Sequence, residues 1–363
     1  MRTISPGTDL SFLASELRPL RDWTVALHPA GTDFVSDGAA ATGYFERHVM
    51  ARISSALGGP VWPPSDSNSG EGRPKNPKKV FVDIGANIGF HTLFALALGH
   101  DVISFEPFGR NVALIRASVA ANEGFAERLW LHKRALTDSD DSGALCILST
   151  EQRVNQGNAR VVVLREPPTQ DELAAGACAG RWVRNGEGET WAEHDSGAGV
   201  LGAGTFQVGE RVESARLDSL VALRTNVHAV KADIEGYEAL ALRGAAALLD
   251  VHAPCTIVFE YNNCNVIRQS GVDCNALIRD LAQRGYRLFE LGSTDDITPS
   301  ALGPDDPPTV KRADGGVSER KWGEYEMRLV TPEARERCAS VMVPRSWESG
   351  EKIVSTSKLT TLK

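Results

Sequence analysis

The sequence predicts an α/β protein with a doubly wound, mostly parallel sheet. Apolar runs at residues 80–82, 101–105 and 228–232 are rich in β-favouring side chains, as expected for strands buried on both faces. Segments with helical spacing lie between these runs, and alternating strands and helices are typical of parallel sheets. Each run also ends in acids or glycines, and in such folds the carboxyl ends of the strands face the ligand.

The first of these runs leads into a glycine loop. Residues 80–91 read VFVDIGANIGFH, which predicts a strand, a tight loop and the start of a helix. Gly85 and Gly89 allow a sharp turn and leave room for a ligand at the helix N-terminus. The residues of this loop expected to bind a cofactor are Asp83, Gly85, Ala86, Asn87 and Gly89.

The charge of the loop indicates which cofactor it holds. A dinucleotide fingerprint would read G-x-G-x-x-G, whereas this loop reads G-x-N-x-G. Asp83 would repel a pyrophosphate but would favour the cationic S-adenosylmethionine. Glu106, followed by Pro107, ends the second run and is positioned to accept both ribose hydroxyls. Two alternatives stay open, a nicotinamide cofactor and a plain βαβ unit with solvated acids.

Three motifs together carry a family resemblance. The segments at 83–89 (DIGANIG), 105–107 (FEP) and 231–238 (KADIEGYE) resemble the FkbM family of S-adenosylmethionine-dependent methyltransferases, within the class I Rossmann-like superfamily. The similarity covers roughly residues 20 to 300. It implies a seven-stranded sheet, S-adenosylmethionine as cofactor, and O-methylation of a hydroxyl on a sugar, glycolipid, polyketide or other secondary metabolite.

Composition excludes several other classes of protein. The chain has 363 residues, 42% of them hydrophobic, and a formal net charge of -8, so it lacks the basic surplus of a nucleic-acid binder. It contains no run of about 18 apolar residues and no apparent secretory signal, so no membrane span is expected. Six cysteines without a CxxC pair suggest reduced thiols in a cytoplasmic protein. The acceptor is expected to be a small molecule or glycan, and the oligomeric state is left open.

The chain divides into four expected parts. Residues 1–57 form an N-terminal extension with helical and strand segments over the cofactor mouth, and 58–79 form a flexible linker rich in Pro, Ser and Gly. The methyltransferase domain spans 80–345, with an insertion at 151–211. The tail at 346–363 is expected to be disordered. Within the extension, the family resemblance makes Tyr44 and Glu46 candidate lid residues.

The insertion interrupts the alternation of strands and helices. We expect a pair of edge strands, at 160–164 and 205–208, flanking a mobile loop. Trp182, Trp191 and His194 would give this loop an aromatic surface for a substrate, although its composition fits disorder equally well.

The remaining elements follow from spacing and caps. We expect a helix at 90–98 ended by Gly99, a helix at 111–121, and a third strand at 129–136. Asp138, just beyond that strand, is a candidate partner of the adenine amine.

The C-terminal half of the domain continues the pattern. A single helix is expected at 237–249 and a strand at 255–263, followed by a helix capped by Asp273 and ended near Gly285. Residues 286–291 and 325–330 are predicted to form the antiparallel pair that closes the sheet.

Charged residues at the strand ends are the candidate catalytic groups. Lys231, Asp233 and Glu235 alternate in sequence, so we expect them to point the same way, and Glu260 ends the next strand. A hydroxyl acceptor benefits from a general base, so Asp233, Glu235 and Glu260 are the candidate catalytic residues, with Asp233 also near the cofactor. His91 is a weaker candidate.

Other readings stay open at this point. No metal is assigned, although converging carboxylates could hold a divalent ion. Within enzymes, the alternative is a nicotinamide-dependent oxidoreductase. From a different class, the alternative is a cofactor-binding subunit that has lost catalysis.

Overall fold

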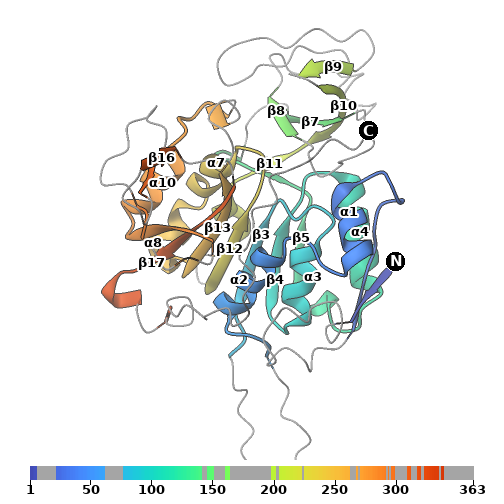
Figure 1. Ribbon diagram of the computed structural model, residues 1–363, viewed down its shortest axis with the longest axis horizontal. Coiled ribbons are helices and arrows are strands. Elements are labelled where there is room, and N and C mark those ends of the chain that lie inside the picture. The colour runs from blue at the N-terminus through green and yellow to red at the C-terminus, as the bar shows by residue number, and fades with distance from the viewer. Residues whose placement is uncertain are drawn as a thin grey trace, which may run out of the picture.

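The fold is described from a computed structural model. It describes residues 1–5, 22–61, 77–140, 145–150, 160–163, 198–201, 204–222, 225–261, 267–268, 270–291, 293, 296–298, 309–311, 317–319, 323–334 and 337–338. Its centre is a seven-stranded sheet in the order β14-β17-β13-β12-β3-β4-β5, with helices on both faces (Figure 1). The predicted α/β fold, with its mostly parallel seven-stranded sheet, is therefore confirmed.

The strands of this sheet are parallel except for β17, which is antiparallel to both of its neighbours. In chain order they are β3 (Val80–Ile84), β4 (Asp101–Phe105), β5 (Leu129–His132), β12 (Val227–Ala232), β13 (Thr256–Tyr261), β14 (Tyr286–Glu290) and β17 (Gly323–Leu329). All six residues of β12 are buried, because helices cover both faces of the sheet centre. The predicted closing pair, β14 and β17, is confirmed.

The helices follow the strands in the expected alternation. They are α1 (Phe34–Thr42), α2 (Arg47–Leu57), α3 (Phe90–Ala97), α4 (Gly109–Ala120), α6 (Leu217–Leu220), α7 (Glu238–Arg243), α8 (Ala246–His252) and α10 (Ala276–Ala282), with short 3-10 turns η2 (Ala126–Arg128) and η4 (Pro332–Ala334). Gly99 follows α3 with a φ of 91°, the left-handed conformation expected after a helix end. No helix in the described part of the chain is long and apolar enough to cross a membrane.

The N-terminal segment packs onto the main sheet. A small sheet joins β1 (Arg2–Ile4) to β2 (Trp23–Val25), and β2 contacts α3 and α4. Helix α2 contacts β12 and α3, and its Arg52 forms a buried ion pair with Glu326 of β17. The segment before the glycine loop is thereby attached to the same core as the sheet.

The insertion contributes to a separate sheet. The strands β7 (Leu145–Thr150), β8 (Arg160–Val163), β9 (Ala198–Leu201) and β10 (Gly204–Val212) pair in the order β8-β7-β10-β9, at the top of Figure 1. The expectation of two edge strands was therefore wrong in its pairing, because β7, which precedes the insertion, pairs with both β8 and β10. Trp182, Trp191, His194 and the tail at 346–363 lie outside the described residues.

Two local predictions about strand and helix bounds need correction. The third strand ends at His132, and Ala135–Leu136 (β6) pairs instead with Ser214–Ala215 (β11). The single helix at 237–249 is broken into α7 and α8 at Gly244, where an added Cβ would lie 2.0 Å from the Thr137 carbonyl oxygen. Because the chain at Gly244 packs closely against the loop that carries Thr137, the helix does not continue through this position.

The cap of the next helix also differs from the prediction. Asn275, not Asp273, is the N-cap residue of α10. Asp273 accepts a hydrogen bond from the Asn275 backbone N–H and pairs with Arg279. Beyond the main sheet, β15 (Thr309–Lys311) and β16 (Val317–Glu319) form a small antiparallel pair.

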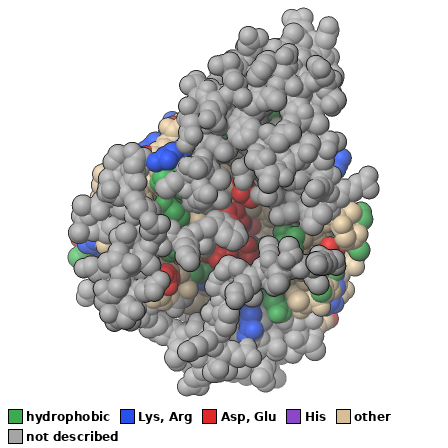
Figure 2. Space-filling view, turned by 45° about the horizontal axis from the view of Figure 1, so that its top comes forward, with side chains coloured by type: hydrophobic (Ala, Val, Ile, Leu, Met, Phe, Trp, Pro, Cys, Tyr) green, Lys and Arg blue, Asp and Glu red, His purple; other side chains and the backbone are tan. Residues whose placement is uncertain are grey.

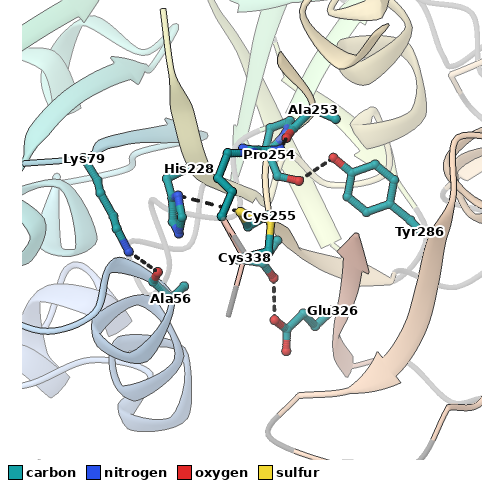
Figure 3. The surroundings of a disulfide bond; sticks show 11 residues. Ala56, Lys79, His228, Ala253, Pro254, Cys255, Tyr286, Glu326 and Cys338 are labelled. Carbon is teal, nitrogen blue, oxygen red and sulfur yellow. Dashed lines mark hydrogen bonds between the residues drawn. A yellow bond between two sulfur atoms is a disulfide. The ribbon is translucent and has the colours of Figure 1, made fainter. Parts of the chain in front are cut away.

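The cysteines within the described residues are oxidised, contrary to the expectation of reduced thiols. Cys255, just before β13, forms a disulfide with Cys338, with their Cα atoms 5.2 Å apart (Figure 3). Cys146 and Cys274 are also disulfide-bonded. Both Cys255 and Cys338 are fully buried, and their 83-residue separation means that only the folded sheet brings them together. Spacing in the sequence alone gave no indication of the pair.

Candidate active site

The glycine loop is held between two strands of the sheet. The backbone N–H groups of Gly85 and Ala86 donate to the Phe105 carbonyl oxygen, at 2.9 and 3.0 Å. Gly85 and Gly89 have φ values of 78° and 83°, and Asn87 between them has a φ of 54°. A Cβ on Gly85 would lie 2.0 Å from the Asp233 carbonyl oxygen, so only glycine fits where the loops after β3 and β12 meet.

Glu106 lies beside this loop at the end of β4. Its Oε2 accepts from the Asn87 backbone N–H, and its Oε1 accepts from the Phe108 backbone N–H, each at 2.8 Å. Burial raises the pKa of Glu106 to about 7, although these hydrogen bonds act in the opposite direction. Its Oε1 also accepts from the Asn111 side-chain amide at 3.5 Å, so the carboxyl is fixed in place and Oε2 retains a lone pair for a further donor.

An apolar pocket opens between the glycine loop and the β5–β6 segment. Its lining residues, largely apolar, are Ile84, Gly85, Phe105, Pro107, Arg134, Ala135, Leu136, Thr137, Ile234 and Tyr237. The pocket adjoins Glu106 and is suited to a flat aromatic base. Asp138, the predicted adenine partner, is exposed and does not line the pocket, whereas its neighbour Thr137 does.

The small sheet reaches the same edge of the molecule. Glu210 of β10 accepts from the Gly109 backbone N–H at 2.8 Å and forms an ion pair with Lys133. Gly109 begins α4, so this carboxylate lies at a helix N-terminus, where negative charge is favourable. The contact ties the insertion to the loop that carries Glu106.

Asp83 is a buried acid with one unused oxygen. Its Oδ2 accepts from the Thr92 hydroxyl at 2.7 Å, while Oδ1 is buried with no hydrogen-bond partner among the described residues. Burial raises the pKa of Asp83, and the nearby Lys231 opposes this shift. An orphaned carboxylate oxygen beneath the glycine loop fits a cofactor that carries a positive charge.

The charged segment after β12 is arranged differently from the prediction. Lys231 Nζ lies 3.2 Å from Asp233 Oδ2 and donates to the Gly85 carbonyl oxygen at 3.2 Å. Burial lowers the pKa of Lys231, but the surrounding carboxylates outweigh this effect and raise it. Strand β12 ends at Ala232, and Glu235 has a φ of 58°, so the predicted strand-like alternation of Lys231, Asp233 and Glu235 was wrong.

Glu238 explains why the chain turns there. Its Oε1 accepts from the backbone N–H groups of Ile234, at 2.8 Å, and Gly236, at 3.3 Å. The side chain is buried, and burial raises its pKa to about 8. Glu238 therefore holds the turn that carries Glu235, a role that the strand interpretation did not anticipate.

Glu260 faces the same acidic group from β13. Burial and the charges of Asp233, Glu235 and Glu238 raise its pKa to about 10, so it carries a proton at neutral pH. Asp233, by contrast, is paired with Lys231. Acidic side chains gather at the centre of the face shown in Figure 2. The three predicted catalytic acids are thus neighbours but differ in protonation and pairing.

His91 and Glu46 lie beside the same acidic group. His91, at the start of α3, is buried, and its Nε2 lies 3.6 Å from Glu46 Oε2. Burial lowers the pKa of His91 well below its usual value, so the ring is neutral. Of the two predicted lid residues, Glu46 approaches the site, whereas Tyr44 packs against the hydrophobic core.

Sequence reasoning missed several residues of the site. Leu136 and Tyr237 line the apolar pocket, and Glu238 holds the adjacent turn. Tyr237 and Glu238 belong to the third motif, which was a usable signal, whereas nothing marked Leu136. Among the described residues, no group of three His, Cys, Asp or Glu side chains is arranged to hold a metal ion.

Comparisons with known proteins give a family and a set of distant structures. The family model described as the methyltransferase FkbM domain matches residues 83–288. The structure of a methyltransferase FkbM from Methylobacillus flagellatus KT is 13% identical with a TM-score of 0.34, covering 69% of this chain and 43% of that chain. This chain thus spans less than half the length of that protein.

A second structure covers more of its own length. The C-terminal domain of precorrin-6Y C5,15-methyltransferase from Rhodobacter capsulatus is 13% identical with a TM-score of 0.32, covering 84% of this chain and 96% of that chain. A comparison with curated proteins finds no match.

Proposed function

This chain belongs to the methyltransferase FkbM family, and from that premise we propose that it is an S-adenosylmethionine-dependent methyltransferase acting on a hydroxyl group. The proposed acceptors are a sugar, a glycolipid, a polyketide or another secondary metabolite. The observation that carries the proposal is the convergence of the glycine loop, Glu106 and the apolar pocket at the carboxyl ends of β3 and β4.

The residues around this edge fit the parts of S-adenosylmethionine. The apolar pocket, with Pro107 and Tyr237, would hold the adenine, and Glu106 would accept hydrogen bonds from the ribose hydroxyls. The orphaned Oδ1 of Asp83 and the charged Asp233 favour the cationic amino acid end. When bound, S-adenosylmethionine would supply an electrophilic methyl group.

The backbone around Gly85 also supports this assignment. Gly85, Ala86, Asn87 and Gly89 form a turn tied to both neighbouring strands, so the loop is held in shape before any ligand binds. A rigid loop is what methyl transfer needs, because catalysis rests mainly on aligning donor and acceptor. In place of Asp138, Thr137 would lie against the adenine, because it lines the apolar pocket.

An acidic acceptor region supports a hydroxyl as the group that is methylated. A hydroxyl becomes a competent nucleophile as its proton leaves, which a nearby carboxylate assists. Asp233, Glu235 and Glu260 lie together there, with Glu260 protonated and Asp233 ion-paired. The proton acceptor would therefore be a carboxylate of this region or one facing it, such as Glu46 beside Asp233, and the protonated Glu260 is better suited to donate a hydrogen bond.

Calorimetric titration with S-adenosylhomocysteine, and in parallel with NADH, tests the cofactor. Micromolar binding of S-adenosylhomocysteine alone is the expected result. Binding of NADH alone would instead establish a nicotinamide cofactor and overturn the proposal.

Methyl transfer is then tested with S-adenosylmethionine labelled on its methyl group and a panel of hydroxylated sugars, glycolipids and polyketides. Labelled product with an alkali-stable ether is expected. Cofactor binding without transfer to any acceptor would indicate a subunit that has lost catalysis.

A further inference from the structure

Glu46 has a backbone conformation that its own helix does not explain. Its φ and ψ are 47° and 63°, a left-handed conformation that is unfavourable for a residue with a Cβ atom. It occupies the N-cap position of α2, yet its side chain makes no capping hydrogen bond to the described helix. The carboxyl is directed at His91 instead, so the unfavourable backbone serves the site rather than the helix.

In the described part of the chain, His91 places an unpartnered buried nitrogen beside Glu46. The side chain is 5% exposed, and its Nε2 has no hydrogen-bond partner among the described residues. The ring also donates a hydrogen bond to the Phe45 backbone. Because Nε2 has no partner within the described ranges, the donor is the other ring nitrogen, Nδ1, and a neutral ring carries a single N–H. Nε2 therefore carries a lone pair, and leaving it unpartnered is costly in a buried position.

Charged groups surround the Glu46 carboxyl from three further elements. Lys231 and Asp233 face it from the end of β12, Glu324 from β17 and His48 from α2. Burial and Asp233 raise the pKa of Glu46 to about 8, with Lys231 acting in the opposite direction. The side chain keeps 22% exposure, so a ligand can reach it. A carboxyl that titrates near the working pH suits proton transfer.

Four other acids of the site have their oxygens or protons committed. Glu106 and Glu238 each accept two backbone N–H groups, and Asp233 is paired with Lys231. Glu260 retains its proton at neutral pH. Glu46 is the carboxyl that combines access, a titration near neutrality and a buried partner for its proton.

We propose that Glu46 is the catalytic base of the reaction, and that His91 is a positioning residue that stabilises the protonated carboxyl through Nε2. This inference rests on the proposed function. The acceptor oxygen forms a bond to the methyl carbon as the carbon–sulfur bond breaks, and that electron pair stays on sulfur. The hydroxyl proton passes to Glu46, which then donates it in a hydrogen bond to His91. The N-terminal segment thus supplies a reacting group to the sheet.

The inference can be tested without knowing the acceptor. Sinefungin, an analogue of S-adenosylmethionine, carries an amine at the position of the transferred methyl group. A carboxylate facing that position would form a charge-assisted hydrogen bond with the ammonium, so the wild-type protein should bind sinefungin roughly tenfold more tightly than S-adenosylhomocysteine. In Glu46→Gln, calorimetry should find this preference lost and S-adenosylhomocysteine binding unchanged.

Matched variants separate Glu46 from its neighbours. Glu127→Gln, on the distant turn η2, is the neutral control and should retain the preference. Retention of the preference in Glu46→Gln, or an equal loss in Glu235→Gln, overturns the inference. If the wild-type protein binds neither compound, the proposed function itself has failed, which is a different result.

Two more variants guard against a merely structural effect. Glu46→Gly, which suits the left-handed backbone, should raise the melting temperature and still lose the preference. The preference for sinefungin needs the ionised form of Glu46, so it should begin above a certain pH. In His91→Asn that pH should be lower, because the protonated form of Glu46 loses its partner. An onset that stays at the wild-type pH contradicts the role of His91.

Discussion

Arg52 in helix α2 and Glu326 in strand β17 form a buried ion pair, with Nη2 and Oε1 2.6 Å apart. The side chain of Glu326 is fully buried, and its other oxygen pairs with Arg328 at 2.9 Å. Thr256 of β13 donates a further hydrogen bond to Glu326. This network joins the segment that carries Glu46 to strands β13 and β17 of the sheet.

Replacing Arg52 with Met should lower the free energy of unfolding by about 3–5 kcal/mol, because Glu326 would keep a buried charge with one partner fewer. Urea denaturation measures this change. Arg116→Met, an exposed arginine on helix α4, is the control and should change stability by less than about 0.5 kcal/mol. Equal effects of the two variants would contradict the structural role of the pair.

Two glycines with the same φ of 78° allow the close approach at the glycine loop to be tested separately from backbone conformation. At Gly124 an added Cβ meets nothing within 4 Å, whereas at Gly85 it meets the Asp233 carbonyl oxygen. Gly124→Ala should therefore cost about 1–2 kcal/mol of stability and leave S-adenosylhomocysteine binding intact. Gly85→Ala should cost more and abolish binding. Intact binding in Gly85→Ala would separate the loop from the cofactor.

The affinity for S-adenosylhomocysteine should rise with pH through the titration of Glu106, whose pKa is about 7. Ribose hydroxyls donate to the ionised carboxylate, so binding favours ionisation and releases a proton. Between pH 6 and 8 the affinity should increase roughly tenfold. Calorimetry should find Glu106→Gln weaker by about 1–3 kcal/mol and insensitive to pH in this window. A parallel pH dependence in both proteins would exclude Glu106 as the ribose partner.

The stability of the unliganded protein should change with pH in the opposite direction to the ligand affinity. The raised pKa of Glu106 means that ionisation is unfavourable in the folded protein. Its contribution to stability is therefore full below the unfolded pKa of 4.5 and is lost as pH rises through about 7. In the absence of ligand, Glu106→Gln should flatten that decline.

The disulfide between Cys255 and Cys338 should contribute about 2–5 kcal/mol to stability, because it closes a long loop of the unfolded chain. The Cys255→Ser, Cys338→Ser double variant should unfold at a correspondingly lower urea concentration. Thiol labelling of the unreduced, denatured wild-type protein, followed by peptide mapping, should leave both cysteines unlabelled. Labelling of either one would contradict the bond.

The sequence was informative wherever chemistry is local. The loop at Gly85 and the acid at Glu106 were located from residue types and spacing, because a glycine turn and a strand end are determined by neighbouring residues. The seven-stranded, mostly parallel sheet followed from the family resemblance, and its closing antiparallel pair was placed correctly.

Features that depend on contacts between distant segments were not predictable. The break at Gly244 results from the Thr137 carbonyl, more than 100 positions earlier in the chain. Cys255 and Cys338 meet only in the folded state. In each case the deciding partner is an atom that residue patterns do not reveal.

Strand β17 lies between β13 and β14, although both of those strands precede it in the chain (Figure 1). During synthesis on the ribosome, β14 cannot pair with the sheet until residues 323–329, which form its neighbour β17, have emerged. Arg52 of helix α2 likewise has no Glu326 to pair with until β17 has been synthesised. Until then, the edge of β13 stays open to other chains, which is the condition under which nascent sheet proteins aggregate or engage chaperones.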